Sequence, residues 1–280
     1  MSDELPFAQE IETNINTAEV QSQVVGIETM ASSLDVRLRG AFITDCELTS
    51  PTTGLRTDVL YAESNLEKPK ITATHPMVPA GPYEGIGGQH GFPRWSDYHE
   101  FPLNDGPNGE KQVAVQAKRS DNGLSLVKAF ELTANSLTTH TTIRSSEDTA
   151  EETSMGEHIY FTLADENFEG LEVNGQSLDE LLGEGSQQTV ENGVAIYWDF
   201  GGEATINFPA GHSVKISADF EGDTKHPLAM WIWKRPGSQS ICFEPIVGIV
   251  GVANFDDDDT SGVKVPPYGS ATLSTRIELL

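Results

Sequence analysis

The chain has few cysteines and few basic residues. Only Cys46 and Cys242 are present among 280 residues, which is too few for a disulfide framework, although one disulfide could form. Reduced thiols in the cytoplasm are therefore the default expectation. There are 17 Lys and Arg against 43 Asp and Glu, and the formal net charge is −26. A field of this sign repels phosphate, so we expect neither a nucleic-acid nor a membrane partner.

Long hydrophobic runs and a leader segment are also missing from this sequence. The most apolar stretch, residues 241–255, is interrupted by Glu244 and Pro245, and no run is long enough to span a bilayer. The first residues lack the basic and apolar parts of a signal peptide. Hydrophobic residues make up 37% of the chain, which suffices for a substantial core. We expect a soluble cytoplasmic protein, either a monomer or a weak homodimer.

Helical patterns are nearly absent, and period-two alternation replaces them. Residues 112–118 and 125–132 alternate clearly, and Asn122-Gly123 between them is typical of a hairpin turn. One short helix is expected at 177–182, where Ser177 and Glu180 have capping-box spacing. Other predicted strands are 34–43, 59–61, 136–144, 158–163, 194–200, 204–208, 213–220, 228–233, 240–244 and 270–278.

The organisation that follows is all-β. A dozen or more strands with almost no helix indicate a large antiparallel sandwich or barrel. Residues 1–25 are predicted to be a flexible lead-in or an edge strand, and residues 26–280 a single domain. Residues 64–110 have little periodicity and many Pro, Gly, His and aromatic residues. We interpret them as an ordered loop region that lines a site.

Three separate segments place a proton-handling side chain beside glycines or apolar strand residues. They are G-G-Q-H-G-F-P-R at 87–94, G-E-H-I-Y-F-T-L at 156–163 and C-F-E-P at 242–245. Two imidazoles and a carboxylate are what a proton-shuttling enzyme needs. From residue 36 to the C-terminus, their order and flanks resemble the aldose 1-epimerase (mutarotase) family. The closest resemblance is to its branch with an H-G-F-x-R segment, which includes hexose-6-phosphate epimerases.

The resemblance implies a fold and roles for individual residues. The fold would be the large antiparallel β-supersandwich of galactose mutarotase-like proteins. Glu244 would be the general base and His158 the acid that protonates the ring oxygen, while His90 and Arg94 would orient the sugar. No metal or other cofactor would be needed.

The chain departs from the family pattern at several positions. Glu157 and Thr162 stand where the family has asparagines. No arginine occurs within 71–89, and no aspartate occurs within 224–243, where the family carries residues that contact the sugar.

The residue types support a binding or catalytic role beside plainer alternatives. An ionised Glu244 buried among apolar residues would be costly unless it is paired, hydrated or functional. The alternative for His90 and His158 is a structural role in the core. Arg94 has a planar guanidinium that suits phosphate or hydroxyl groups, and the alternative for it is a surface ion pair.

The strand predicted at 228–233 carries two tryptophans on one face, and two basic residues follow it. Trp231 and Trp233 are expected to stack on a sugar or to belong to the core. Lys234 and Arg235 are candidate phosphate ligands. The other histidines lack metal-site spacing, and the aspartates at 256–259 lack the twelfth ligand of a calcium loop, so no metal site is expected.

The sequence therefore predicts an enzyme that interconverts the α and β anomers of a hexose or hexose 6-phosphate by acid–base ring opening. The alternative is a non-catalytic carbohydrate-binding protein on the same fold, and a third reading is a polysaccharide-processing enzyme. In the first case His90, His158 and Glu244 should meet in one open cleft, because acid and base must reach opposite sides of one ring.

Overall fold

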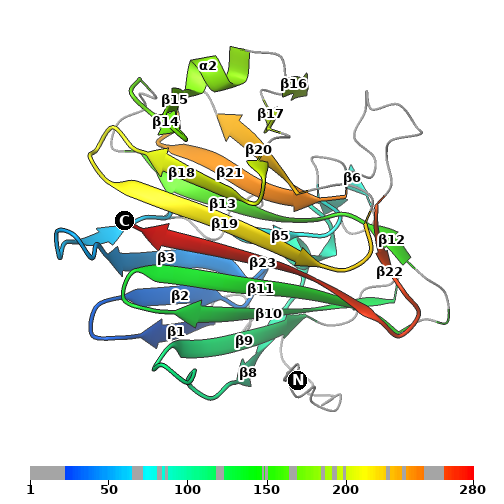
Figure 1. The fold of residues 1–280 in the computed structure, drawn as a ribbon. Coiled ribbons are helices and arrows are strands. Elements are labelled where there is room, and N and C mark those ends of the chain that lie inside the picture. The colour runs from blue at the N-terminus through cyan, green and yellow to red at the C-terminus, as the bar shows by residue number, and fades with distance from the viewer. Residues whose placement is uncertain are drawn as a thin grey trace.

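Antiparallel strands make up most of the structure, which is a computed structural model (Figure 1). It describes residues 23–64, 72–80, 84–85, 88–117, 123–146, 148, 151–163, 169–183, 187–190, 194–197, 200–224, 228–234, 238–248 and 262–280. Within these ranges the helices are η1 (Phe92–Trp95) and α2 (Leu178–Gly183). Neither has the length and hydrophobicity that a membrane span requires.

The largest sheet has nine strands in the order β15-β14-β18-β19-β23-β11-β10-β9-β8. Their bounds are β8 (Tyr98–Pro102), β9 (Lys111–Ala117), β10 (Leu124–Leu132), β11 (Ser136–Ser145), β14 (Glu172–Val173), β15 (Gln176–Ser177), β18 (Glu203–Asn207), β19 (Ser213–Glu221) and β23 (Ser270–Leu279). The C-terminal β23 lies between β19 and β11, so the end of the chain closes the middle of this sheet.

The second sheet has six strands in the order β16-β17-β20-β21-β13-β5 and holds most of the predicted site. Its strands are β5 (His75–Met77), β13 (Met155–Thr162), β16 (Gln187–Val190), β17 (Val194–Tyr197), β20 (Ala229–Lys234) and β21 (Ser240–Val247). In β13 and β21 all residues but Thr162 are buried, so both faces of these strands are covered.

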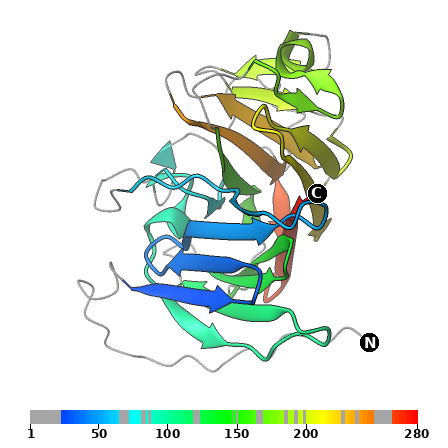
Figure 2. The same ribbon diagram turned by 90° about the vertical axis from the view of Figure 1, so that its left-hand side faces the viewer.

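A four-stranded sheet and two small ribbons complete the fold. The four-stranded sheet is β1 (Val24–Glu28), β2 (Ser33–Arg37), β3 (Phe42–Thr49) and β4 (Arg56–Asp58), in that order, and it lies beside β8–β11 in two views (Figure 2). The ribbons pair β6 (Glu84–Gly85) with β7 (Gly88–Gln89), and β12 (Glu151–Thr153) with β22 (Val263–Val265). One hydrophobic cluster contains members of all three large sheets, for example Leu34, Phe130 and Phe243.

A buried ion pair crosses this core between the two larger sheets. Lys128 of β10 donates to Glu157 of β13, and the two residues are 0% and 2% exposed. The Thr141 hydroxyl of β11 donates to the other carboxylate oxygen at 3.4 Å. Burial lowers the pKa of Lys128, and the neighbouring Glu157 carboxylate opposes that shift. Strands β10, β11 and β13 are thus held in one arrangement by charge as well as by packing.

Most predicted strands and the capped helix are observed. Ser177 Oγ and Glu180 form the reciprocal capping contacts before α2. The 34–43 segment turns at Gly40, whose φ is 80°, and continues as β3.

Two local predictions were wrong. Strand β4 lies at 56–58 rather than 59–61, where Leu60 makes only an isolated bridge to Phe161. The described parts of 64–110 contain β5 to β8 and η1, so they are not loop alone. These elements form because they pair with distant strands, which leaves no local periodicity.

We expect Lys128→Met to lower the free energy of unfolding by about 3–5 kcal/mol, because it leaves the Glu157 charge buried and unpaired. The double variant Lys128→Met/Glu157→Met should recover most of that loss, since it removes both charges. Urea unfolding of purified protein measures both effects. Lys215→Met, which removes a partly exposed pair with Glu203 at 2.7 Å, is the control and should change stability by about 1 kcal/mol or less. A Lys128→Met variant as stable as this control would contradict the argument.

Candidate functional site

Two rows of side chains cross one face of the six-stranded sheet. In the first row Trp231 of β20 is paired with Glu244 of β21, and His158 of β13 is paired with His75 of β5. The register between β13 and β21 places His158 beside Glu244. Directly paired residues point to the same face of a sheet, so four strands contribute neighbouring side chains.

The second row lies two residues further along each strand. Trp233 is paired with Cys242, and Cys242 with Tyr160. Because side chains alternate with period two, this row shares its face with the first. Ile159 and Phe161, the intervening residues of β13, belong to the main hydrophobic cluster instead. Strand β13 therefore has a polar site face and a core face, and Glu157 occurs on the core face.

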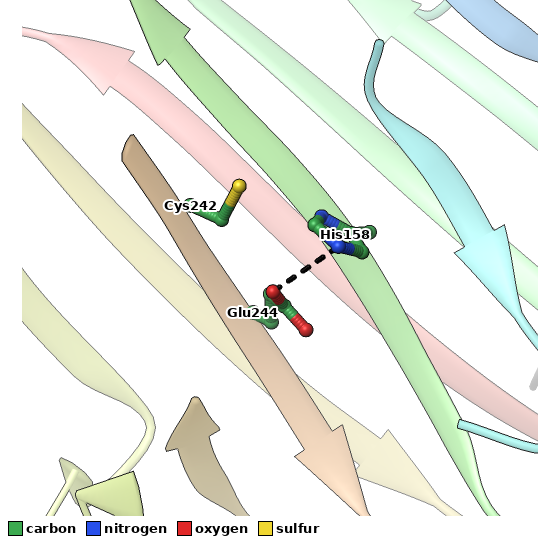
Figure 3. Close-up of side chains that lie close together, drawn as sticks. All are labelled: His158, Cys242 and Glu244. Carbon is green, nitrogen blue, oxygen red and sulfur yellow. Dashed lines mark ion pairs between the residues drawn. The ribbon is translucent and has the colours of Figure 1, made fainter. Parts of the chain in front are cut away.

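His158 and Glu244 form the centre of the site (Figure 3). His158 Nε2 lies 3.3 Å from Glu244 Oε1, and the Tyr160 hydroxyl lies 3.4 Å from the same nitrogen. The rings of His158 and Tyr160 are stacked, with centroids 4.4 Å apart and an interplanar angle of 4°. This stacking holds the imidazole against rotation and keeps Nε2 toward the carboxylate.

Burial sets the protonation of this pair. It raises the pKa of Glu244 to about 8, because an ionised carboxylate loses its hydration there. Burial also lowers the pKa of His158 well below its usual value, and the nearby His90 and Arg94 lower it further. Near neutral pH the pair therefore holds a single proton, which burial favours on the carboxyl group. One proton shared by an acid and a base 3.3 Å apart is an arrangement suited to proton transfer.

The 87–94 segment places His90 and Arg94 beside this pair. His90 has a φ of 65° and its ring centroid lies 5.0 Å from that of His158 at 88°. Gly91 follows with a φ of 74°, and a Cβ there would lie 1.7 Å from the Val78 carbonyl oxygen, so only glycine fits. Arg94 lies on η1 and is buried, with its guanidinium 5.5 Å from the Trp95 ring centroid. The glycine is thus what turns the histidine toward the site.

Cys242 is a site residue to which the sequence alone assigned no role, whereas His75 was expected only as part of the region 64–110 that lines a site. His75 is fully buried, and its Nδ1 donates to the Ala73 carbonyl at 2.7 Å, which leaves Nε2 unprotonated. Its ring stacks 5.0 Å from that of His158. Cys242 could have been found from alternation, because it precedes Glu244 by two residues. The pairing of His75 with His158 could not have been found in this way, since β5 is too short to show a pattern.

The other residues predicted to bind the sugar or its phosphate lie at different places relative to the site. Trp231 is 2% exposed, and its Nε1 has no hydrogen-bond acceptor among the described residues. Trp233 is partly buried, and its ring lies edge-on 6.0 Å from His158. Lys234 ends β20 opposite Ile241, but its side chain lies outside the described residues. The same holds for all of Arg235 and for the aspartates at 256–259.

The structure brings His90, His158 and Glu244 together, but it buries the three side chains where the sequence predicts an open cleft. They are 7%, 3% and 3% exposed, respectively. The cause is that both faces of β13 and β21 are covered.

Comparisons with known proteins identify the fold. No family model matches the sequence, and no curated protein matches it. A galactose mutarotase-like protein from Lactobacillus casei has a TM-score of 0.66 and 16% identity, covering 92% of this chain and 100% of that one. A galactose mutarotase related enzyme from Lactobacillus acidophilus has a TM-score of 0.68 and 15% identity, covering 92% and 97%. An aldose epimerase homologue from C. elegans has a TM-score of 0.62 and 9% identity, covering 92% and 98%.

These identities show the fold and no more. The all-β architecture expected from the sequence, a large antiparallel sandwich of galactose mutarotase-like type, is confirmed.

The pKa of Glu244 predicts how stability depends on pH. The folded protein keeps the Glu244 proton up to about pH 8, whereas an unfolded chain releases it near its ordinary value of 4.5. Between these values the folded state binds more protons, so the stabilisation present below pH 4.5 is lost as pH rises toward 8. Glu244→Gln cannot ionise, so its stability relative to wild type should rise across this window by at most about 1.4 kcal/mol per pH unit.

Urea unfolding of both proteins at several pH values measures this difference, in which the other titrating groups cancel. A difference that does not change with pH would show that the Glu244 pKa is not raised by folding.

Proposed function

We propose that the protein is an aldose 1-epimerase that interconverts the α and β anomers of a hexose by acid–base ring opening. The observation that carries the proposal is the buried His158–Glu244 pair, which holds one proton across 3.3 Å. The likeness to mutarotase-like folds supports it, because the pair lies on a fold that proteins of that description share.

Ring opening uses the pair as acid and base together. The shared proton first passes from Glu244 to His158 Nε2 across the 3.3 Å that separates them. Glu244 then removes the proton from the C1 hydroxyl while His158 delivers its proton to the ring oxygen, and the C1–O5 bond breaks to give the open-chain aldehyde. Rotation about C1–C2 presents the other face of the carbonyl. The ring oxygen then attacks C1, returns its proton to His158, and the new C1 alkoxide takes the proton from Glu244. Each cycle leaves the pair with the single proton that it began with.

Neighbouring side chains supply the contacts that hold a sugar in place. His90 and Arg94 lie beside the pair and are assigned to the sugar hydroxyls. Trp231 Nε1 is a buried donor for which the described residues offer no acceptor, and a hydroxyl would satisfy it. The half-buried ring of Trp233 suits stacking on the apolar face of a pyranose. His75 presents an unprotonated Nε2, which is an acceptor for a hydroxyl.

A carbohydrate-binding protein without catalysis is the alternative function. Binding alone gives no reason to bury a carboxylate beside an imidazole, since neutral amides would hold hydroxyls at a lower desolvation cost. The raised pKa of Glu244 therefore favours the enzyme.

We expect Glu244→Gln to reduce the rate of anomer exchange by about 10²- to 10⁴-fold while sugar binding largely persists. Glutamine keeps the size and the hydrogen bonding of the side chain but cannot accept the C1 proton. NMR exchange spectroscopy on several hexoses measures the rate, and Glu203→Gln on the exposed side of β18 is the matched control. Wild-type exchange by the Glu244 variant would mean that Glu244 is not the base, and binding without exchange by wild type would establish the alternative.

A phosphorylated hexose is the finer form of the proposal. Arg94 is a buried cation beside the pair in a chain whose net charge is −26, so its charge acts locally against an otherwise repulsive field. A planar guanidinium binds phosphate oxygens through two parallel hydrogen bonds.

We expect a hexose 6-phosphate to bind more tightly than the free hexose, and Arg94→Ala to abolish that preference by weakening the binding of the phosphate more than that of the free hexose. Competition between the two ligands at low and moderate salt measures the preference. Arg276→Ala on β23 is the control, because that arginine lies on the nine-stranded sheet. Equal binding of both ligands by the wild type would assign a neutral sugar as substrate.

A further inference from the structure

One nucleophilic side chain in the site has no part in the proposed reaction. Cys242 lies between Trp233 and Tyr160 in the second row and is buried and unoxidised. A donor atom of Cys242, one of His158 and one of Glu244 all lie within 4.8 Å of one another (Figure 3). A thiol, an imidazole and a carboxyl group therefore converge on a single point between strands β13 and β21.

We propose that His158, Cys242 and Glu244 bind a thiophilic divalent cation of the Zn²⁺ class, and that this cation blocks proton transfer. The binding site stands on the three side chains alone. The blocking of proton transfer rests on the function proposed above.

The donor set selects the class of cation. Zinc takes thiolate sulfur, imidazole nitrogen and carboxylate oxygen together, usually in a tetrahedron, whereas Mg²⁺ and Ca²⁺ require oxygen ligands. Tetrahedral zinc bonds of about 2.0–2.3 Å place neighbouring donor atoms roughly 3.3–3.7 Å apart. His158 Nε2 and Glu244 Oε1 are already 3.3 Å apart, so only the sulfur has to approach, by a side-chain rotation.

Charge balance favours the cation in this buried position. A thiolate and a carboxylate carry two negative charges, and with a neutral imidazole they cancel the charge of one dication. A neutral cluster avoids the large desolvation cost of an isolated buried charge. Binding breaks the S–H bond of Cys242 and the O–H bond of Glu244 and forms two bonds to the metal, and two protons pass to solvent.

The sheet itself preorganises the ligands. Cys242 and Glu244 are two residues apart on β21 and so share a face, and His158 lies on the neighbouring strand. The stacked Tyr160 ring already fixes His158 with Nε2 toward the other ligands. Within the described residues no fourth His, Cys, Asp or Glu joins the group, so a water completes the coordination.

The cation would occupy the electron pairs that the proposed reaction uses. His158 Nε2 and a Glu244 oxygen each need a free lone pair to accept a proton. A metal bound to both removes acid and base at once, without any change in the rest of the fold. Sugar chemistry and cation binding are then mutually exclusive at one site.

Cobalt titration tests the site without depending on enzyme activity. Metal-free protein is titrated with Co²⁺, whose thiolate charge-transfer absorption reports a sulfur ligand, and Zn²⁺ then displaces it. We expect one equivalent to bind with this absorption in wild type and in Cys46→Ala, which removes the other buried cysteine. Cys242→Ser should lose the absorption and bind at least about tenfold more weakly, and Mg²⁺ should not compete.

A second variant keeps the test decisive if Cys242→Ser does not fold. Glu244→Gln retains the thiol, so it should keep the absorption but bind Co²⁺ more weakly than wild type. No absorption in the wild type, or an equal affinity in Cys242→Ser, would overturn the site.

The activity measurement is separate. If wild type exchanges anomers, one equivalent of Zn²⁺ should abolish exchange in wild type and in Cys46→Ala. Exchange that persists with the metal bound would overturn the blocking. A protein that binds Co²⁺ through Cys242 but never exchanges anomers would instead refute the epimerase and leave the metal site standing.

Discussion

The alternation of side chains along β13 is the constraint on which the rest of this structure depends. One face of the strand carries Ile159 and Phe161 into the core, and the other presents His158 and Tyr160 to the site. A slip of one residue would exchange the two faces. Glu157 opposes that slip, because only in the observed register does it reach Lys128 across the core. Leaving the Glu157 carboxylate buried and unpaired would cost far more than displacing an apolar side chain, so the buried ion pair specifies the register that places the His158 imidazole.

The sequence shows the alternation of apolar and polar side chains along each strand, but it does not show which distant strands pair. This alternation predicts most of the strands, and it predicts that His158 and Tyr160 share one face of their strand, as do Trp231 and Trp233. It could not show that His75 pairs with His158, because that contact depends on the docking of a three-residue strand across more than eighty residues of chain. The same reason explains why the sequence predicts a loop region where β5 to β8 lie. Very short strands are stabilised by their partners, so the evidence for them lies elsewhere in the chain.

Burial shifts the pKa values of His158 and Glu244, and it also lowers the stability of the folded protein when Glu244 ionises. The sequence indicated a carboxyl group among apolar residues, but only the structure shows that its neighbour is an imidazole with a lowered pKa. The two shifts share burial as their main cause and have opposite directions, so burial favours the shared proton on the carboxyl group over the imidazole. Stability is lost when Glu244 ionises, and such a cost persists where a site requires it.

The properties that suit the pair to proton transfer also suit it to a metal. A lone pair that accepts a proton also binds a Lewis acid, and Cys242 adds the soft donor that distinguishes zinc from harder cations. A protein that only moved protons would be safer with an alanine or valine at that position, whose side chains cannot bind metal. Burial and the neighbouring Glu244 raise the pKa of Cys242 well above its ordinary value, and the hydrogen bond from Tyr160 opposes that shift only in part, so a cation that binds the sulfur has to displace the thiol proton.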